Sequence, residues 1–356
     1  MAWVEKLRIE DLRVLRRVEI ELGPGLNVFF GSNAQGKTSV LEAIALLARG
    51  RSFRTDDLAT LIRRGMTRTL ASAEAEGGAG RAILAVELTS DGRRFARNGR
   101  VVPFREYNGH IEAAVYGTER LKVIHGGMRE RRLWIDRSAS ALSTTYRKLT
   151  VSYEKAVQQR NASLQQRSRD LSAWDEAVLD FGADLRLARS EYAEKLNRAL
   201  ETGYRPNAEL YAVASASAPG SDKESLKRAF RLDLTRSRGA ELQAGRTLSG
   251  PHRDAVVLTI DGEDAARFAS AGQSRSLLLA LTLATLAVHE AETHEPAIAL
   301  LDDLDSELDE SRAAGVCEAV ARRGQALVTT AHPAWARSVA GCGRLFSVED
   351  GNIEAA

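Results

Sequence analysis

The segment Gly31–Ile44 reads GSNAQGKTSVLEAI and is the most informative stretch of this chain. The apolar run Leu26–Phe30 precedes it, and apolar residues recur at helical spacing after it. The pattern G-x-x-x-x-G-K-T therefore lies between a predicted strand and a predicted helix, as a phosphate-binding loop (P-loop) requires. We expect Lys37 to neutralise the β- and γ-phosphates of a nucleotide and Thr38 to offer its hydroxyl to Mg²⁺. The predicted nucleotide-binding residues are Gly31, Ser32, Asn33, Ala34, Gln35, Gly36, Lys37, Thr38 and Ser39.

Composition predicts a cytoplasmic protein with no membrane association. The length of 356 residues suggests about two or three structural units, and the 44% of apolar residues allow a large core to be buried. No run approaches the roughly 18 consecutive apolar residues that span a bilayer, and the charged N-terminus is unlike a signal peptide. Cys317 and Cys342 lie in no paired or metal-like spacing. Residues 49–137 carry 18 Lys and Arg against 11 Asp and Glu, which favours a polyanionic partner, although these arginines could equally be solvated surface.

A second, acidic segment is expected to complete the phosphate site. The apolar run from residue 297 to residue 301 has the length of a buried strand, and it ends on Asp302 and Asp303. Asp302 would hold Mg²⁺, directly or through water. Asp303, one residue further on, would orient or deprotonate the attacking water. A solvated acidic turn is the alternative, which the preceding apolar run disfavours.

Residues 270–273 read SAGQ and open a predicted helix rich in leucine. Ser270 can cap this helix, because its hydroxyl satisfies a free N–H, and that role alone accounts for the pattern. The segment also lies about 30 residues before the Asp pair, an arrangement that resembles the ABC-type ATPases. In those proteins the signature loop of one subunit presents Ser and Gly to the nucleotide on the P-loop of the other. The resemblance implies that Ser270, Gly272 and Gln273 of a second copy complete the site.

The same resemblance assigns roles to further residues. Asp303 stands where most of the superfamily has Glu, so it is a competent base but a slow one. The predicted strand ALVTT precedes Ala331 and His332, and either His332 or Thr330 would sense the γ-phosphate, unless His332 is an ordinary loop residue. The resemblance also implies a D-loop at Ser306 and Asp309.

A helical segment separates the two halves of the predicted site. Apolar residues from Leu171 to Ala199 step by three and four, and a similar stripe runs from Tyr146 to Val157. Residues 165–170 would turn the chain between two helices, and residues 206–221 would form a loop-rich return. Residues 81–104 alternate like a hairpin with a turn at Asp91-Gly92 or Asn98-Gly99. We therefore expect an ATPase domain at 1–135 plus 246–356 and an inserted helical arm domain at 136–245.

Six motifs together resemble the RecF family, recombination mediators related to the heads of SMC proteins. They match over nearly the whole chain, and LSGPHRD before the signature loop is more diagnostic than the P-loop. The motifs are GSNAQGKTSVLEAI, GRSFRT (50–55), ERRLWIDR (130–137), LSGPHRD (248–254), SAGQSRSLLLALTLA and LLDDLDSELD. The implied fold class is α/β, an ABC-type P-loop ATPase head of mixed sheets with helices, carrying an inserted all-α paired-helix domain.

The resemblance implies a weak, DNA-stimulated ATPase that uses ATP and Mg²⁺. RecF-like proteins dimerise head to tail around two nucleotides on gapped or duplex DNA. With RecO and RecR they promote loading of RecA in recombinational repair and replication restart, and hydrolysis separates the dimer. Two departures bear on this expectation. Ala34 stands where the family usually has Gly, and Ala255 replaces a second acidic residue after Asp254.

The expected DNA surface reads the phosphate backbone and is therefore salt-sensitive. His252 and Arg253 would sense nucleotide or DNA, or would only shape the turn after Pro251. The main alternative function is the ATP-binding subunit of an ABC transporter, and a second is an ATP-gated scaffold with negligible turnover. The candidate DNA-binding residues are Arg51, Arg54, Arg63, Arg64, Arg129, Arg131 and Arg132.

Overall fold

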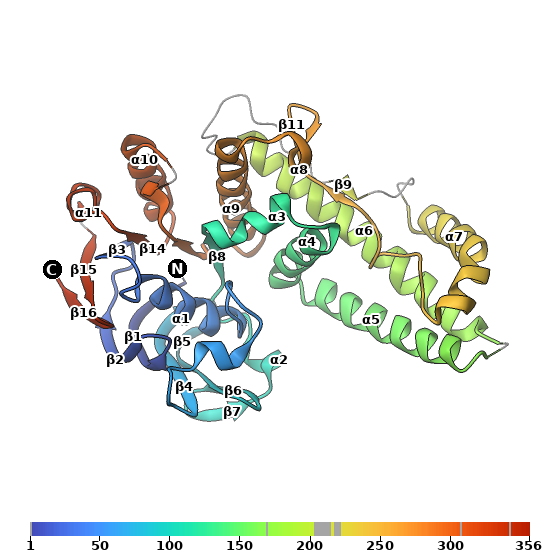
Figure 1. Cartoon of the computed structure of the whole chain (residues 1–356), viewed down its shortest axis with the longest axis horizontal. Helices are drawn as coiled ribbons and strands as arrows, with labels where there is room; N and C mark the ends of the chain where they lie inside the picture. Colours follow the sequence, from blue (N-terminus) through green and yellow to red (C-terminus); the bar gives the residue numbers. More distant parts are fainter. Residues whose placement is uncertain (1, 169, 203–214, 217–221, 307, 342) are drawn as a thin grey trace. The chain divides into compact units, whose positions relative to one another are not determined.

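The computed structural model describes residues 2–168, 170–202, 215–216, 222–306, 308–341 and 343–356 (Figure 1). Its contacts divide the chain into two compact units. Unit 1 comprises Met1–Leu121 and Leu278–Ala356, and unit 2 comprises Lys122–Leu277. Unit 2 therefore extends beyond the expected insertion, 136–245, at both ends. One reason is that helix α4 (Met128–Leu142) runs without a break through residue 135.

An antiparallel sheet forms one layer of unit 1, with the strand order β2-β1-β4-β5-β6-β7. Buried residues alternate with partly or fully exposed ones along β4 and β5, because one face of the sheet covers the core. The predicted hairpin is confirmed, and both candidate turns occur, since β5 pairs with β6 and β6 with β7. The strands are β1 (Trp3–Leu12), β2 (Leu15–Glu21), β4 (Arg68–Gly77), β5 (Gly80–Thr89), β6 (Gly92–Arg97) and β7 (Arg100–Val102).

A second sheet in unit 1, ordered β16-β15-β3-β14-β13-β8, brings distant parts of the sequence together. β14 pairs in parallel with β3 on one side and with β13 on the other, and Val328 lies opposite both Val28 and Leu301. The carboxyl ends of β3 and β13 therefore lie at the same edge. The strands are β3 (Leu26–Phe30), β8 (Ala113–Tyr116), β13 (Ile298–Leu301), β14 (Ala326–Thr330), β15 (Arg344–Glu349) and β16 (Asn352–Ala355).

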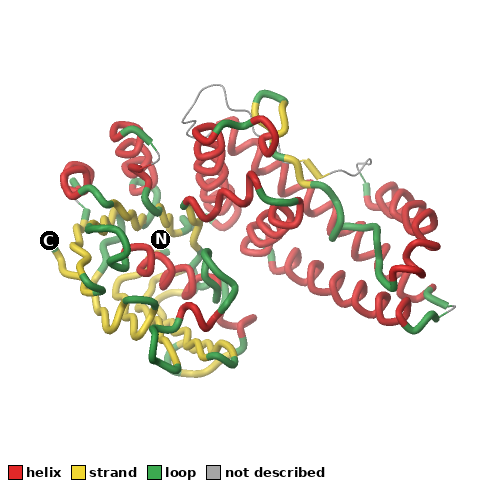
Figure 2. The backbone as a smooth tube through the Cα atoms, viewed as in Figure 1, coloured by secondary structure: helices red, strands yellow, loops and turns green. Residues whose placement is uncertain are grey.

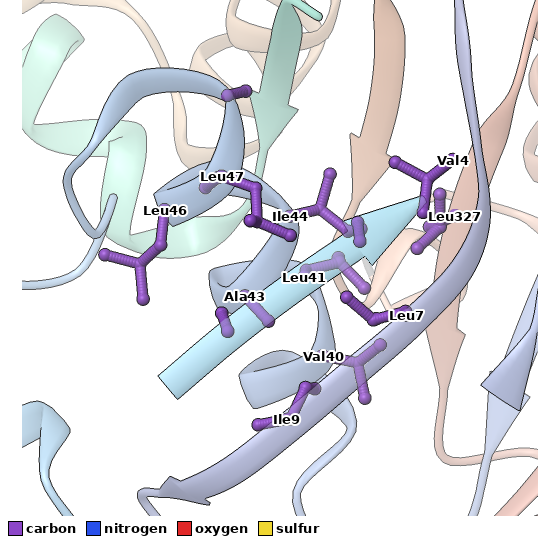
Figure 3. Packing of buried hydrophobic residues seen from close by; sticks show 14 of the residues in the cluster. Val4, Leu7, Ile9, Val40, Leu41, Ala43, Ile44, Leu46, Leu47 and Leu327 are labelled. Carbon is purple, nitrogen blue, oxygen red and sulfur yellow. The ribbon is translucent and has the colours of Figure 1, made fainter. Parts of the chain in front are cut away.

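Helix α1 (Lys37–Arg49) contributes to a core that contains residues of both sheets. Val40, Leu41 and Ile44 are buried and belong to one cluster with Leu7 of β1 and Leu327 of β14 (Figure 3). A second cluster joins α9 (Ala271–Thr293), α10 and α11 to the second sheet. The remaining helices of unit 1 are η1 (Leu58–Leu61), α2 (Phe104–Tyr107), η2 (Thr118–Leu121), η3 (Leu304–Ser306), α10 (Glu310–Ala321) and α11 (Pro333–Ala340).

Helix α9 (Ala271–Thr293) crosses the boundary between the units in sequence. By length and composition it could span a membrane, but 56% of its most apolar window is buried within the protein. Leu278, Leu279 and Leu286 belong to the second core cluster of unit 1. Its apolar character therefore has an explanation in the fold itself.

Unit 2 is built on long helices (Figure 2). The predicted helix pair is confirmed as α5 (Thr144–Gln165) and α6 (Ser172–Thr202), and a third helix, α7 (Lys223–Ala244), packs against α6. The predicted stripe is buried at Val178, Leu185 and Tyr192, but Trp174 is exposed. Most of the expected return at 206–221 lies outside the described residues. The other elements are α3 (Lys122–His125), β9 (Ser215–Ala216), β10 (Val256–Val257), β11 (Thr259–Ile260), β12 (Glu263–Asp264) and α8 (Ala265–Phe268).

Candidate nucleotide-binding site

The P-loop joins β3 to α1 and wraps around the amine of Lys37. The Nζ of Lys37 donates to the carbonyl oxygens of Gly31, at 2.7 Å, and of Ser32, at 2.8 Å. A side chain at Gly31 is excluded, because its Cβ would lie 2.2 Å from the carbonyl oxygen of Val348 at a backbone φ of +153°. The loop thus brings a cation and the N-terminus of α1 to one place, which suits a bound phosphate.

Ala34 adopts the left-handed conformation that glycine favours, with φ of 66°. This conformation costs an L-residue roughly 1–2 kcal/mol. The neighbouring residue is held firmly. The side chain of Gln35 accepts the N–H of Asp350 at 2.6 Å, and its carbonyl oxygen accepts that of Gly351 at 3.2 Å. The turn between β15 and β16 therefore secures the loop in a conformation that Ala34 alone disfavours.

Thr38 and Asp302 meet as the parallel register requires. The hydroxyl of Thr38 donates to Oδ1 of Asp302 at 2.9 Å, and the hydroxyl of Thr329 donates to the same oxygen at 2.6 Å. Burial raises the pKa of Asp302 above its usual range, although both hydrogen bonds oppose this effect. Thr329 was not predicted from the sequence, although its place near the end of β14, beside β13, was an available signal.

The residues present fit Mg²⁺, which prefers oxygen ligands and keeps several waters. Thr38 and Asp302 supply a hydroxyl and a carboxylate at one point. Within the described residues no three His, Cys, Asp or Glu side chains are grouped so as to hold a metal. The other ligands of the ion would therefore be phosphate oxygens and water, as in other P-loop proteins.

Asp303 follows Asp302 in a left-handed conformation, with φ of 54°, and its N–H donates to the hydroxyl of Thr329 at 2.9 Å. Burial lowers the pKa of the Lys37 amine, while the charges of Asp303, Asp302 and Asp305 oppose that effect. Three carboxylates thus act on one amine at the edge where β3 and β13 end.

Asp305 is a second residue that the sequence analysis missed. Its side chain is only 2% exposed, and its Oδ2 contacts the hydroxyl of Thr330 and, at 2.7 Å, Nδ1 of His332. Both candidate sensors, Thr330 and His332, are therefore bound to one carboxylate. Asp305 lies within the motif LLDDLDSELD, but no role was assigned to it, because nothing in the local pattern shows that it meets Thr330 and His332, 25 and 27 positions away.

The candidate signature loop lies in unit 2, and the P-loop lies in unit 1. The hydroxyl of Ser270 accepts the N–H of Gln273 at 3.2 Å, and the side chain of Gln273 accepts the N–H of Ser270 at 2.9 Å. This capping box confirms the capping role. Ser270 and Gly272 remain exposed.

The predicted D-loop residues lie near the start of α10. Asp309 caps this helix by accepting the N–H of Arg312 at 3.0 Å. The side chain of Ser306 lies outside the described part of the chain. A capping role for Asp309 therefore stands beside its predicted D-loop role.

The candidate DNA-binding arginines have different environments. Arg131 is removed from the set, because its side chain is 2% exposed and donates to the carbonyl oxygens of Ile124 and Val256. Arg54 pairs with Glu119 at 2.9 Å, and its charge lowers the pKa of Asp302, so it acts on the nucleotide site. The others are Arg51, which is partly exposed; Arg63, paired with Asp11; Arg132, bonded to the carbonyl oxygen of Asp254; and Arg64 and Arg129, both exposed.

The SGPHRD motif fastens the returning chain to the helices of unit 2. Asp254 forms two hydrogen bonds of 2.7 Å with Arg186 of α6. Nδ1 of His252 lies 2.6 Å from the hydroxyl of Tyr153 of α5, and burial lowers the pKa of this imidazole. These contacts give His252 a structural role, whereas Arg253 is exposed, and sensing of nucleotide or DNA stays a prediction for both residues.

Comparison with known proteins identifies the family. Residues 3–354 match the model of the RecF/RecN/SMC N terminal domain. Two proteins named "DNA replication and repair protein RecF", from Streptococcus pneumoniae strains CGSP14 and P1031, are 31% and 32% identical to this chain, and 98% of each chain is covered.

Solved structures agree with this result. The structure titled RecF-ATPrS in the RecFOR pathway superposes with a TM-score of 0.88 at 25% identity, covering 99% of this chain and 98% of the other. A Smc head domain from Pyrococcus furiosus, with a TM-score of 0.59 at 15% identity and coverage of 100% and 96%, shares the fold. The expected ABC-type ATPase head is confirmed, and the chain belongs to the RecF family of the RecF/RecN/SMC proteins.

Proposed function

We propose that this protein is an ATP-dependent, DNA-binding recombination mediator that dimerises around ATP. One observation carries the proposal. Lys37, Thr38 and Asp302 form half of a nucleotide site in unit 1, while the same chain exposes a signature loop at Ser270 and Gly272. Each half lacks what the other supplies, so two copies would complete two sites. The named relatives support this function, and the transporter alternative is not favoured.

In the proposed cycle, ATP binds with its β- and γ-phosphates against Lys37 and the P-loop backbone. Thr38 and Asp302 would hold Mg²⁺, which, when bound, neutralises charge on the transferred phosphate. The partner's signature loop then covers the nucleotide. Asp303 would position the attacking water, and hydrolysis would remove the group that joins the two copies. Nucleotide thereby shifts a monomer–dimer equilibrium, because ATP binds the two states with different affinity.

The proposed partners are duplex DNA next to single-stranded gaps, RecO, RecR and RecA, in the cytoplasm. Arg64 and Arg129 are the best-supported DNA contacts, because both are exposed. Such contacts bind DNA phosphates. Each phosphate that is neutralised makes the slope of log affinity against log salt concentration steeper by about 0.9. We expect Arg64→Glu and Arg129→Glu each to weaken binding to gapped duplex and to reduce its salt dependence.

Light scattering with Mg-ATP, with and without gapped duplex, tests the proposal. We expect wild type to dimerise and Lys37→Met to remain monomeric. Ser270→Arg should still bind ATP on its own P-loop but remain monomeric, because Ser270 would contact the ATP that the other copy holds. Ser172→Arg is the matched control, since Ser172 is an exposed serine that begins another helix of unit 2. A wild type that stays monomeric under all conditions contradicts the dimer, and normal dimerisation of Ser270→Arg contradicts its role in trans.

A further inference from the structure

Asp305 is a buried carboxylate that the proposed cycle does not yet use. Its side chain is 2% exposed, and its Oδ1 makes no hydrogen bond within the described residues. A buried polar atom without a partner costs about 1–3 kcal/mol, more if the group is charged. Asp305 is therefore a costly residue for a turn whose only task is to connect β13 to α10.

The other oxygen of Asp305 joins two neighbouring groups. Oδ2 accepts the hydroxyl of Thr330 and lies 2.7 Å from Nδ1 of His332. The oxygen of Thr330 also accepts the backbone N–H of His332 at 2.9 Å. Thr330 is thus engaged both as a donor and as an acceptor, which leaves its hydroxyl no proton for a phosphate oxygen.

His332 has one ring nitrogen that is engaged by Asp305 and one that is not. Its side chain is 65% exposed, and Nε2 makes no hydrogen bond to any residue that the structure describes. When Nδ1 is bound to a carboxylate, the ring is oriented and Nε2 becomes the outward-facing atom. Since Thr330 has no free proton and His332 has a free ring nitrogen, His332 is the better candidate for the sensor.

Three acidic residues act on His332. The hydrogen bond and the charge of Asp305 raise the pKa of the imidazole, and the charges of Asp303 and Glu310 act in the same direction. A protonated ring presents N–H groups at both nitrogens. Asp305 also acts on the Lys37 amine, where the proposed phosphates would bind, so the Asp305–His332 pair belongs to this end of the site.

We propose that Asp305 is a positioning residue for ATP hydrolysis, holding His332 by Nδ1 so that Nε2–H donates to the terminal phosphate. The inference rests on the proposed function, since it needs ATP on the P-loop. It chooses His332 over Thr330 as the sensor and assigns Thr330 to the support of Asp305. It also gives the buried carboxylate a role other than packing, because its negative charge acts on His332.

Asp305→Asn separates this role from a structural one. The amide has nearly the same shape but carries no charge, so it keeps the packing of the side chain and removes the charge that acts on His332. The orientation and protonation of His332, however, should change. Asp305→Asn and His332→Gln, alone and combined, form a double-mutant cycle. Glu310→Gln is the matched control, because Glu310 acts on His332 only through its charge.

The first measurement is an NMR titration of His332 without nucleotide, assigned by comparison with His332→Gln. We expect Asp305→Asn to lower the titration midpoint clearly and Glu310→Gln to lower it less. This result does not depend on ATP or DNA. An unchanged midpoint in Asp305→Asn overturns the pairing of Asp305 with His332.

The second measurement is single-turnover ATP hydrolysis beside ATP affinity. Removing one donor to developing charge costs up to about 10²–10³ in rate, so we expect His332→Gln to hydrolyse ATP about 10- to 100-fold more slowly, with a smaller loss of ATP affinity. Asp305→Asn should be slower by a similar factor, and the double variant no slower than His332→Gln. Glu310→Gln should hydrolyse ATP as wild type does. Additive losses overturn the inference.

The two measurements also separate this inference from the proposed function. If wild type binds ATP without hydrolysing it, the proposed ATPase is contradicted. In that case the Nε2 resonance of His332 must still shift when ATP binds, and it must shift less in Asp305→Asn. A resonance that ATP does not move contradicts the positioning role by itself.

Discussion

Replacing Ala34 with glycine tests the backbone conformation of the P-loop. Ala34 has φ of 66°, which costs an L-residue about 1–2 kcal/mol relative to a right-handed conformation. Glycine removes this cost, but it adds about 0.4–1 kcal/mol of conformational entropy to the unfolded chain. We expect Ala34→Gly to raise the free energy of unfolding by up to about 1.5 kcal/mol, the difference between these ranges.

A second alanine provides the control. Ala319 is exposed like Ala34, but it lies inside helix α10, where the backbone is right-handed. Ala319→Gly should therefore lower the free energy of unfolding by about 0.5–1 kcal/mol. The two substitutions make the same chemical change in the same unit, and the expected effects have opposite signs.

Denaturant unfolding of the ATP-free protein, followed by a probe in unit 1, measures both effects. Thermal unfolding offers a second measurement, because a change of 1 kcal/mol in a unit of about 200 residues shifts the Tm by about 2–4 °C. If Ala34→Gly destabilises as much as Ala319→Gly, the left-handed conformation of Ala34 is wrong. An equal rise in both variants would mean that glycine is preferred even at a right-handed helical position, which also refutes the reasoning.

Three further substitutions test other parts of the structure. Gly31→Ala places a Cβ 2.2 Å from the carbonyl oxygen of Val348, so ATP affinity measured by calorimetry should fall at least tenfold, about 1.4 kcal/mol; unchanged affinity would contradict this contact. Arg160→Met leaves the fully buried Glu241 without its partner at 2.6 Å, and denaturant unfolding of unit 2 should show a loss of about 3–5 kcal/mol. Burial lowers the pKa of His252, so the unfolded chain binds a proton that the folded chain does not; wild type should lose stability as pH falls through about 6.5, and His252→Gln should lose less.

The P-loop, the acidic strand end and the helical arm could be predicted because each is encoded locally. The spaced glycines that lead into Lys37 and Thr38 predict a phosphate-binding loop. The apolar run before Asp302 predicts a buried strand, and the apolar residues spaced by three and four predict packed helices. Boundaries were less predictable. Residues 246–254 carry no helical pattern, yet hydrogen bonds such as that from Arg160 to Thr247 join them to the helices of unit 2.

The sequence by itself determined the family, the P-loop and the strand that supplies Asp302, because these depend on residue order and short-range periodicity. Only the tertiary structure decided which side chains meet. Register across β3, β14 and β13 brings Thr329 to Asp302, the turn after β13 brings Asp305 to His332, and burial takes Arg131 out of reach of DNA. The first two contacts join residues that are 27 positions apart, and the third effect depends on exclusion of solvent. A local sequence pattern specifies neither property.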